Sequence, residues 1–292
     1  MFGHTPVLLD EVIQFLDPRP GGAFIDATLG AGGHTRAILD RTSPDGRMLV
    51  FDQDESALAA AKETLQSFGS RVQFIHSNFR EVAACAAQYG FLGCDGVLAD
   101  IGISSMMVDD PSRGFSFMRE GPLDMRMDRS QALTAADVVN TYSEKEIADI
   151  LYTYGEERRS RPIARSIVRS RPMHGTADLV RAIQRVSGGP RHGQIHPATR
   201  TFQGLRIYVN DELKSLESFV DASMAVVRSG GRIVVITFHS LEDRIVKQRF
   251  RAPVVPGRAL TKKVVTATDA EVQRNPRARS AKLRAWERSY GD

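Results

Sequence analysis

One short segment restricts the possible folds of this chain more than any other: a strand-like run, a glycine-rich turn and a helix. The apolar run at residues 23–27 is followed by Thr-Leu-Gly-Ala-Gly-Gly-His, and a helix is expected to begin near His34. A second strand-like run, residues 47–52, ends at Asp52, 20 residues after Gly32. Backbone amides at such a helix N-terminus approach a ligand closely, and a carboxylate at this separation binds ribose hydroxyls. The segment predicts a βαβ unit that holds a nucleoside-containing ligand.

Further strand-like runs extend this unit into a larger fold. Residues 72–76 and 96–100 are short and apolar, which is typical of strands buried on both faces of a parallel sheet. Residues 230–240 predict a fifth core strand, and the alternation at residues 281–285 predicts a late edge strand that could be antiparallel. The Pro-, Lys- and Arg-rich residues 253–280 predict a loop. The expected fold class is α/β, with a Rossmann-like sheet.

The pattern changes between about residues 130 and 200, where we find no convincing strand. Thr134, Ser143 and Thr176 are candidate helix N-caps. Glu146 lies where a capping box with Ser143 requires it. These signals predict an inserted all-helical domain.

The insertion sets the predicted domain boundaries. A single long helix from about residue 201 to residue 227 is expected to return the chain to the sheet, because apolar residues recur there at helical spacing. The predicted core is therefore discontinuous, residues 1–112 and 201–292. Residues 113–200 then form a connecting loop and the helical insertion.

Charge is distributed very unevenly along the chain. Residues 1–157 hold 12 Lys or Arg against 24 Asp or Glu, whereas residues 158–292 hold 27 against 11. Arginine dominates the second part, as in RRSRPIARSIVRSRP at residues 158–172. The planar guanidinium of arginine suits phosphate and stacks on bases. A nucleic-acid partner is therefore favoured over a merely solvated basic surface.

The composition is that of an ordinary globular protein, with 42% hydrophobic and 25% charged residues. No apolar run approaches the roughly 18 to 20 residues that a membrane span requires, and the N-terminal stretch lacks the pattern of a signal peptide. Cys85 and Cys94 have neither metal-ligand spacing nor the density of a disulfide scaffold. We expect a cytoplasmic protein with reduced thiols and no membrane association.

The glycine turn also indicates which nucleoside-containing ligand is bound. A dinucleotide fingerprint requires a third glycine where this chain has Thr35, so NAD fits poorly. The pattern from Asp26 through Gly30 to Gly32 resembles the first motif of S-adenosylmethionine (SAM)-dependent methyltransferases. Phe79 follows the third predicted strand. An aromatic ring at this place could lie against adenine, or it could be a core residue at the start of a helix. The sequence leaves both interpretations of Phe79 open.

Asp100 ends the fourth predicted strand, at the carboxyl edge where open sheets bind ligands. Residues 113–128 follow, and they are too long and too apolar for a linker, which suggests a functional loop.

Seven stretches together make the chain similar to a known family. They are residues 4–11 (HTPVLLDE), 30–34 (GAGGH), 113–128 (RGFSFMREGPLDMRMD), 154–157 (YGEE), 196–203 (HPATRTFQ), 238–246 (FHSLEDRIV) and 275–280 (NPRARS). In these stretches the chain resembles the MraW/RsmH family, the bacterial 16S ribosomal RNA cytosine-N4 methyltransferases. The resemblance covers almost the whole chain and implies a methyltransferase sheet interrupted by a helical domain.

The resemblance also implies roles for individual residues. The implied cofactor-binding residues are Gly32, Gly33 and His34 on the turn, Asp52 at the ribose, Phe79 beside the adenine and Asp100 near the methyl donor. The implied cofactor is SAM, with S-adenosylhomocysteine as product. The implied partner is 16S ribosomal RNA or the small ribosomal subunit, with a cytidine of the decoding region as target. No metal is expected, because the sulfonium already activates the methyl group. The oligomeric state stays open.

The chemistry makes Asp100 the candidate catalytic residue. A cytosine amine is a poor nucleophile until hydrogen-bond acceptors turn its lone pair out of conjugation. DNA amino-methyltransferases do this with an Asp/Asn-Pro-Pro-aromatic tetrapeptide, whereas residues 100–103 read Asp-Ile-Gly-Ile. We interpret Asp100 either as the acceptor for the amine or as a ligand of the cofactor. Phe115 or Phe117 is expected to replace the missing aromatic and stack on an extruded base.

Basic residues are expected to hold the RNA phosphates. They are Arg158, Arg159, Arg161, Arg165, Arg169 and Arg171 on the insertion, with Arg244, Lys247, Arg249 and residues 274–284. Two other functions stay open, a SAM-dependent methyltransferase of another polymer and an RNA-binding ribosome assembly factor with a degenerate cofactor site. The second draws on one departure, because the family usually has glutamine where this chain has Met107.

Overall fold

The chain forms two compact units. The computed structural model describes residues 6–190 and 193–290, so His4 and Thr5 of the first matching stretch lie outside the described residues. Unit 1 comprises Met1–Gly102 and Leu213–Asp292, and unit 2 comprises Ile103–Glu212. The predicted insertion, residues 113–200, falls inside unit 2.

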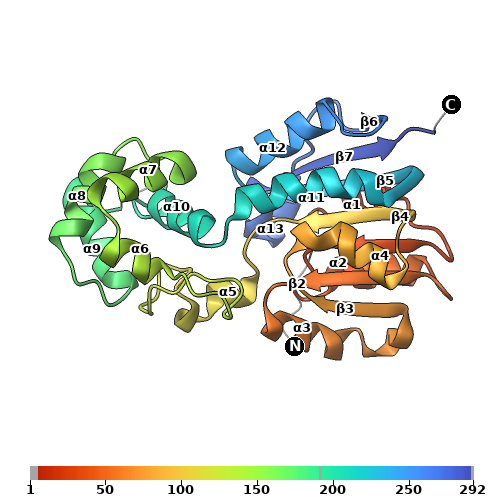
Figure 1. Cartoon of the computed structure of the whole chain (residues 1–292), viewed down its shortest axis with the longest axis horizontal. Coiled ribbons are helices and arrows are strands. Elements are labelled where there is room, and N and C mark those ends of the chain that lie inside the picture. Colours follow the sequence, from red (N-terminus) through yellow and green to blue (C-terminus); the bar gives the residue numbers. More distant parts are fainter. Residues whose placement is uncertain (1–5, 191–192, 291–292) are drawn as a thin grey trace. The chain divides into compact units, whose positions relative to one another are not determined.

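Unit 1 is built on a seven-stranded sheet with the order β3-β2-β1-β4-β5-β7-β6 (Figure 1). The strands are β1 (Ala23–Asp26), β2 (Arg47–Asp52), β3 (Val72–His76), β4 (Cys94–Asp100), β5 (Val227–Thr237), β6 (Gly257–Ala259) and β7 (Lys282–Arg288). Strands β1 to β5 are parallel, and β7 is antiparallel to both β5 and β6. The late antiparallel strand is therefore confirmed, but it does not lie at the edge, because β6 pairs outside it.

The region expected to be a loop, residues 253–280, contains two regular elements. It forms β6 and the helix α13 (Asp269–Arg274). The strand is only three residues long, and its pairing with β7 depends on contacts between segments far apart in the sequence. Local patterns do not reveal such a strand.

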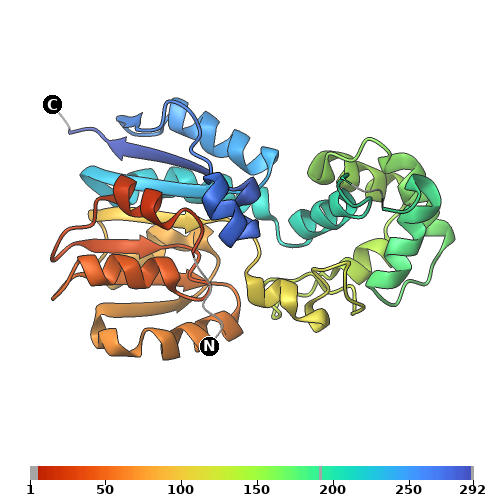
Figure 2. The ribbon, with the colours of Figure 1, turned by 180° about the vertical axis from the view of Figure 1, so that it is seen from behind.

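Helices cover both faces of the sheet. They are α1 (Leu9–Leu16), α2 (Gly33–Arg41), α3 (Glu55–Thr64), α4 (Val82–Tyr89), α11 (Glu212–Val226) and α12 (Ser240–Arg251), and the short 3₁₀ segments of unit 1 are η1 (Gln66–Arg71), η2 (Phe79–Glu81) and η4 (Pro276–Ser280). Alternate side chains of each strand face opposite sides. Ile25 and Phe51 pack with α4, α11 and α12, whereas Phe24 and Val50 pack with α1, α2 and α3. The two groups of helices lie on opposite faces of the sheet (Figures 1 and 2).

Unit 2 contains helices and no strand among its described residues. They are α5 (Ser105–Asp109), η3 (Pro111–Arg113), α6 (Ala135–Thr141), α7 (Glu144–Gly155), α8 (Ser160–Arg169), α9 (Thr176–Ser187) and α10 (Thr199–Val209). The predicted caps Thr134 and Ser143 both form capping boxes. The third predicted cap is one residue too late, because Gly175 is the N-cap of α9 and Thr176 is its first residue.

The single helix expected over residues 201–227 is wrong. The structure has α10 and α11 instead, separated at Asn210 and Asp211. The backbone of Asp211 is in the left-handed region, with φ of 49°. The side chain of Asn210 donates from Nδ2 to the carbonyl of Met125 over 2.7 Å, and its Oδ1 accepts from the backbone amide of Met127 over 2.7 Å. The apolar spacing continues across the break because both helices are amphipathic, so periodicity alone does not locate it.

None of the helices in the described part of the chain combines the length and the apolar character that a membrane crossing requires.

Candidate functional site

Three aspartates lie where parallel strands end, at the edge of the sheet that we call the carboxyl edge. Asp26 closes β1, Asp52 closes β2 and Asp100 closes β4. Each lies two residues after a strand side chain of the layer formed with α1, α2 and α3, so the three carboxyl groups share that face. The strand order reverses direction between β1 and β4. Open α/β sheets bind ligands at such a point.

The glycine turn is held against this edge. The amide of Gly30 donates to Asp52 Oδ2 over 2.9 Å. Gly32, the N-cap of α2, has φ of 79°, which a residue with a side chain rarely adopts. A Cβ at Gly33 would lie 2.4 Å from Pro6 Cγ. The turn therefore needs glycine at both positions, and the strand-turn-helix prediction is confirmed.

Asp26 and Asp52 are carboxyl groups removed from water. Asp26 is 1% exposed and accepts hydrogen bonds from the Thr35 hydroxyl at 2.6 Å and the Thr28 amide at 3.1 Å. Burial outweighs these bonds and raises the pKa of Asp26 to about 6. Asp52 accepts a second hydrogen bond, from the Asp54 amide at 2.9 Å, and burial likewise raises its pKa to about 6.

The carboxylate of Asp100 lies near His34, and one of its oxygens has no hydrogen-bond donor among the described residues. Its amide donates to Thr28 Oγ1 over 2.6 Å, which fixes the end of β4. Its Oδ2 lies 4.0 Å from His34 Nδ1, whereas its buried Oδ1 meets no hydrogen-bond donor within the described ranges. Burial raises the pKa of Asp100 to about 6; His34 opposes this rise, and the charges of Asp26 and Glu242 add to it. A buried acceptor without a donor is costly unless a ligand supplies one.

His34 stands between the N-terminal segment and Asp100. Its Nε2 lies 2.9 Å from the carbonyl oxygen of Val7, which can only accept, so Nε2 carries a proton. The other ring nitrogen, Nδ1, faces the Asp100 carboxylate at 4.0 Å. His34 therefore connects the N-terminal segment to the carboxyl edge.

The structure brings five of the six predicted cofactor residues together and places the sixth on the other face. Gly32, Gly33, His34, Asp52 and Asp100 gather at the carboxyl edge on the side of α2. Phe79 instead packs in the layer of α4 and α11, 9% exposed, with its ring edge-on to that of Phe219 at 5.2 Å. The contact of Phe79 with adenine stays a prediction.

Residues 238–246 form one of the matching stretches, but the sequence did not point to a role for Phe238, His239 or Glu242 in the site. His239 caps α12, and its Nε2 lies 2.9 Å from Glu242 Oε1. Glu242 is 1% exposed and accepts from the amide of Phe238 at 2.8 Å. The ring of Phe238 lies against Gly102, two residues after Asp100. The signal was the His-x-x-Glu spacing directly after a strand, which matches a capping box with histidine as the cap.

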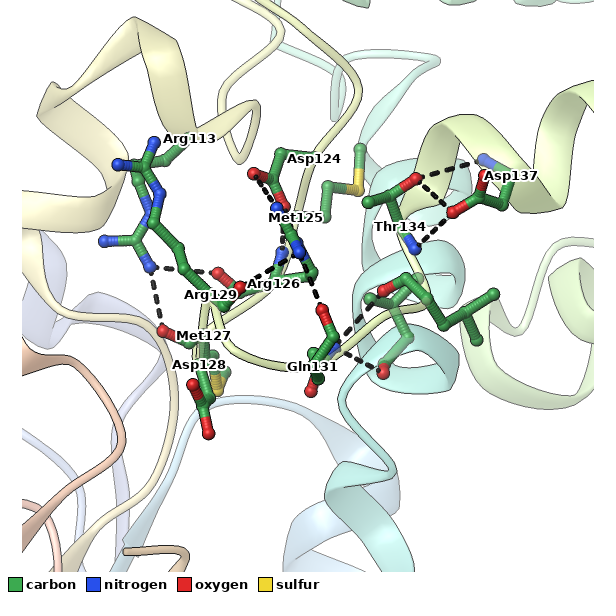
Figure 3. Close-up of polar contacts among 12 residues, drawn as sticks. Arg113, Asp124, Met125, Arg126, Met127, Asp128, Arg129, Gln131, Thr134 and Asp137 are labelled. Carbon is green, nitrogen blue, oxygen red and sulfur yellow. Dashed lines mark hydrogen bonds and ion pairs between the residues drawn. The ribbon is translucent and has the colours of Figure 1, made fainter. Parts of the chain in front are cut away.

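The loop at residues 113–128 is an ordered part of unit 2 (Figure 3). The guanidinium of Arg113 is 4% exposed and donates to the carbonyls of Arg126 and Met127, each over 2.9 Å. Arg126 in turn forms a two-pronged ion pair with Asp124, at 2.6 and 3.1 Å, and donates to the carbonyl of Gln131 at 2.6 Å. Side-chain bonds from the buried Arg113 and the partly buried Arg126 thus hold this loop in place of regular secondary structure.

Comparison with known proteins identifies the family. A model of the MraW methylase family matches residues 1–289. The chain belongs to the MraW methylase family. Its curated relatives include ribosomal RNA small subunit methyltransferase H of Nostoc sp. (strain PCC 7120), 52% identical over 290 residues, which cover 99% of this chain and 93% of that protein. The same protein of Sorangium cellulosum (strain So ce56) is 52% identical over 291 residues, covering 99% and 91%. That of Dehalococcoides mccartyi (strain BAV1) is 47% identical over 304 residues, covering 98% and 87%.

The carboxyl edge of this MraW methylase fits a cationic methyl donor that carries a nucleoside. Asp26, Asp52 and Asp100 bring three carboxyl groups to one face, and a positive charge beside them would offset part of the cost of their burial. Oδ1 of Asp100 is also a buried acceptor to which no described residue donates a hydrogen bond. These features suit SAM, whereas the places of Asp52 at the ribose and of Asp100 near the methyl donor stay predictions.

The departure of this chain from the family pattern at Met107 has a packing explanation. Met107 is 4% exposed and lies in the apolar core of unit 2. An apolar side chain suits that environment.

The expected stacking role of the two loop phenylalanines is not supported. Phe115 is 7% exposed and belongs to the core of unit 2, which leaves no free face for a base. Phe117 is stacked on His196 with ring centroids 4.5 Å apart and meets Phe202 edge-on at 5.4 Å. Both rings pack within unit 2, and the prediction that either replaces the missing aromatic stays untested.

The predicted RNA-binding arginines divide into two groups. Some are engaged within the protein: Arg171 donates to the carbonyls of Val139 and Tyr142, Arg165 pairs with Glu144, Arg249 pairs with Asp221, and Arg284 pairs with Asp243. Arg158, Arg161 and Arg169 are exposed at or on α8, and no side-chain partner is found for them among the residues that the structure describes. The second group is available for phosphate.

Proposed function

We propose that this protein transfers a methyl group from SAM to the exocyclic N4 of a cytidine in the decoding region of small-subunit (16S) ribosomal RNA. The names of its relatives support ribosomal RNA of the small subunit as the substrate. The observation that carries the N4 chemistry is Asp100, whose buried Oδ1 faces no donor, at the end of β4 beside the glycine turn. Such an acceptor is what an amine needs when it must be deprotonated during attack.

The residues of the chain then have separate tasks in one displacement. When bound, SAM supplies a methyl group on a sulfonium that needs no further activation. The turn at Gly32 and the carboxylate of Asp52 hold the donor, so that the methyl carbon meets the amine nitrogen at roughly 3 to 3.5 Å. Asp100 Oδ1 accepts an N4–H hydrogen bond, which frees the nitrogen lone pair. Bound SAM would supply the methyl group and leave as S-adenosylhomocysteine, and Asp100 would accept the proton that N4 releases.

His34 has a positioning role beside Asp100. Its Nε2 lies 2.9 Å from the carbonyl oxygen of Val7, and its Nδ1 lies 4.0 Å from Asp100 Oδ2. The side chain of Asp100 is 25% exposed, so the proton that it accepts can pass to water, which restores the carboxylate for the next turnover.

Unit 2 is proposed as the RNA-binding domain, in line with the predicted division at residues 113–200. Helix α8 has an apolar face in the core, with Ile163 and Ile167 fully buried, and presents Arg161 and Arg169 outward. Phosphate contacts of this kind position an RNA without reading its sequence. They suit a substrate whose target base is selected by its place in a folded subunit.

The experiment uses small ribosomal subunits from a strain that lacks the gene, purified protein and methyl-labelled SAM. Mass spectrometry of the RNA is expected to show one N4-methylated cytidine in the decoding region. The Asp100→Asn variant is expected to bind SAM with near-normal affinity and to lose about a hundredfold or more in rate. Equal losses in SAM affinity and in rate would make Asp100 a cofactor ligand instead. Label in DNA or protein, or no measurable SAM binding by calorimetry, would favour the other polymer or the assembly factor.

A further inference from the structure

The site lacks the aromatic residue that a cytosine-binding pocket needs next to its acceptor, and Phe238 is in the position to supply it. Strand β5 runs parallel to β4, and Ile236 is opposite Asp100. Phe238 comes two residues after Ile236, and Gly102 comes two residues after Asp100, so Phe238 lies level with Gly102. The amide of Ile101 donates to the carbonyl of Ile236 over 2.9 Å and keeps the two strands paired up to this point.

Phe238 also shares the face on which the carboxyl groups gather. Its ring packs against the apolar layer of α1, α2 and α3, to which Val234 and Ile236 also belong. Asp100 lies on the same face, two residues after Leu98 of that layer. The ring and the acceptor carboxylate therefore stand on neighbouring strands and on one side of the sheet.

Gly102 lies beside the ring. Its φ of 133° belongs to a conformation that side-chain-bearing residues rarely adopt, and a Cβ there would be in ordinary van der Waals contact with Phe238, 3.5 Å from its Cδ2. The backbone that leaves β4 is therefore next to the ring. Phe238 itself remains partly exposed, as a ring that receives a ligand must be.

The backbone at Phe238 is fixed by a buried charge. Glu242 is 1% exposed, and its Oε2 accepts the amides of Phe238 at 2.8 Å and of His239 at 3.2 Å. These two hydrogen bonds connect the end of β5 to the first turn of α12. A ring on a rigid backbone loses little entropy when a base stacks on it.

We propose that Phe238 stacks on the target cytosine and holds its amine beside Asp100, the task that the aromatic of the Asp/Asn-Pro-Pro-aromatic tetrapeptide performs from within one segment. The proposal rests on the proposed function, because it assumes that an extruded cytosine is the substrate. Here the aromatic comes from the next strand, which explains why residues 101–103 contain neither proline nor an aromatic. Extruded bases are commonly held by aromatic stacking and edge hydrogen bonds together.

The test compares three full-length variants on small subunits from the deletion strain. Phe238→Leu keeps apolar bulk and removes the aromatic face, whereas Phe238→Tyr restores the face. Phe74→Leu is the matched control, because Phe74 is a partly buried ring of the same apolar layer that lies in the edge strand β3. Each variant is measured for SAM affinity by calorimetry, for kcat/KM toward the subunit and for thermal midpoint.

The expected result is a loss of about ten- to a hundredfold in kcat/KM for Phe238→Leu, with SAM affinity within twofold of wild type and with recovery in Phe238→Tyr. Phe74→Leu is expected to keep its kcat/KM. Equal kcat/KM in the two leucine variants would overturn the role of Phe238, as would a loss of SAM affinity that matches the loss of rate. A wild-type protein that leaves the subunit unmethylated would overturn the proposed function itself, and the two failures are thereby separated.

Discussion

Replacing Asp26 with asparagine isolates the energetic cost of a buried charge in unit 1. Asp26 Oδ1 accepts the Thr28 amide and Oδ2 accepts the Thr35 hydroxyl. Asparagine can keep the first bond through its carbonyl oxygen, and the Thr35 hydroxyl can rotate to accept from the new NH₂ group. The variant therefore removes the charge of a 1% exposed side chain with little change in shape.

The size and the sign follow from the pKa of Asp26. Burial raises it from 3.8 to about 6, so the folded state binds a proton more tightly than the unfolded state does. At about 1.4 kcal/mol per pKa unit, the ionised group costs about 3 kcal/mol of folding free energy above pH 6. This cost shrinks as the pH falls from 6 toward 4, where the folded state is already protonated, and is about 1 kcal/mol near pH 4.5. Asp26→Asn should therefore stabilise unit 1 by about 3 kcal/mol at pH 8 and by much less at pH 4.5.

The chain provides a suitable probe for this measurement. Trp286 is its single tryptophan, is fully buried in β7 and reports the unfolding of unit 1. Urea unfolding followed by its fluorescence at the two pH values gives the difference between wild type and variant. Asp45→Asn, at an exposed aspartate, is the control and should show no such dependence. An Asp26→Asn protein that is less stable than wild type at pH 8, or a difference that does not change with pH, would refute the reasoning.

Three further predictions concern activity, the loop and RNA binding. Because burial raises the pKa of Asp100 to about 6 and the carboxylate is the active form, kcat/KM should fall to about a tenth of its plateau at pH 5; a profile that is flat between pH 5 and 8 would contradict this. Asn210→Ala removes the side-chain bonds to Met125 and Met127, so urea unfolding followed by circular dichroism should show unit 2 destabilised by about 2 to 4 kcal/mol; a loss below about 1 kcal/mol would mean that these bonds do not hold the loop. Changing Arg161 and Arg169 to serine should reduce the slope of log Kd against log salt for small-subunit RNA by between one and two; an unchanged slope would place the RNA elsewhere.

Much of the fold was predictable because it depends on neighbours along the chain. The run of apolar residues in β2, the glycines of the turn and the spacing to Asp52 are all local signals, and the structure has each of them where the sequence predicted. The Ser143 capping box is equally local, since both partners lie within four residues. By contrast, the break between α10 and α11 depends on a bond from Asn210 to a loop more than 80 residues earlier.

The candidate site shows the same division. The sequence pointed to His34 and Asp100 separately, but not to the fact that one imidazole nitrogen is occupied by Val7 and the other faces Asp100. It also pointed to Phe115 or Phe117 as the stacking aromatic, but not to the packing of both rings within unit 2.

By itself the sequence determined the first four parallel strands, the glycine turn and the family, because amino-acid type and spacing dictate these at short range. Only the tertiary structure decided which arginines are engaged, where the helix breaks and which aromatic lies beside Gly102. The reason is strand register: pairing Ile236 with Asp100 sets Phe238 beside Gly102, 136 positions earlier in the chain, and no local pattern in the sequence encodes that pairing.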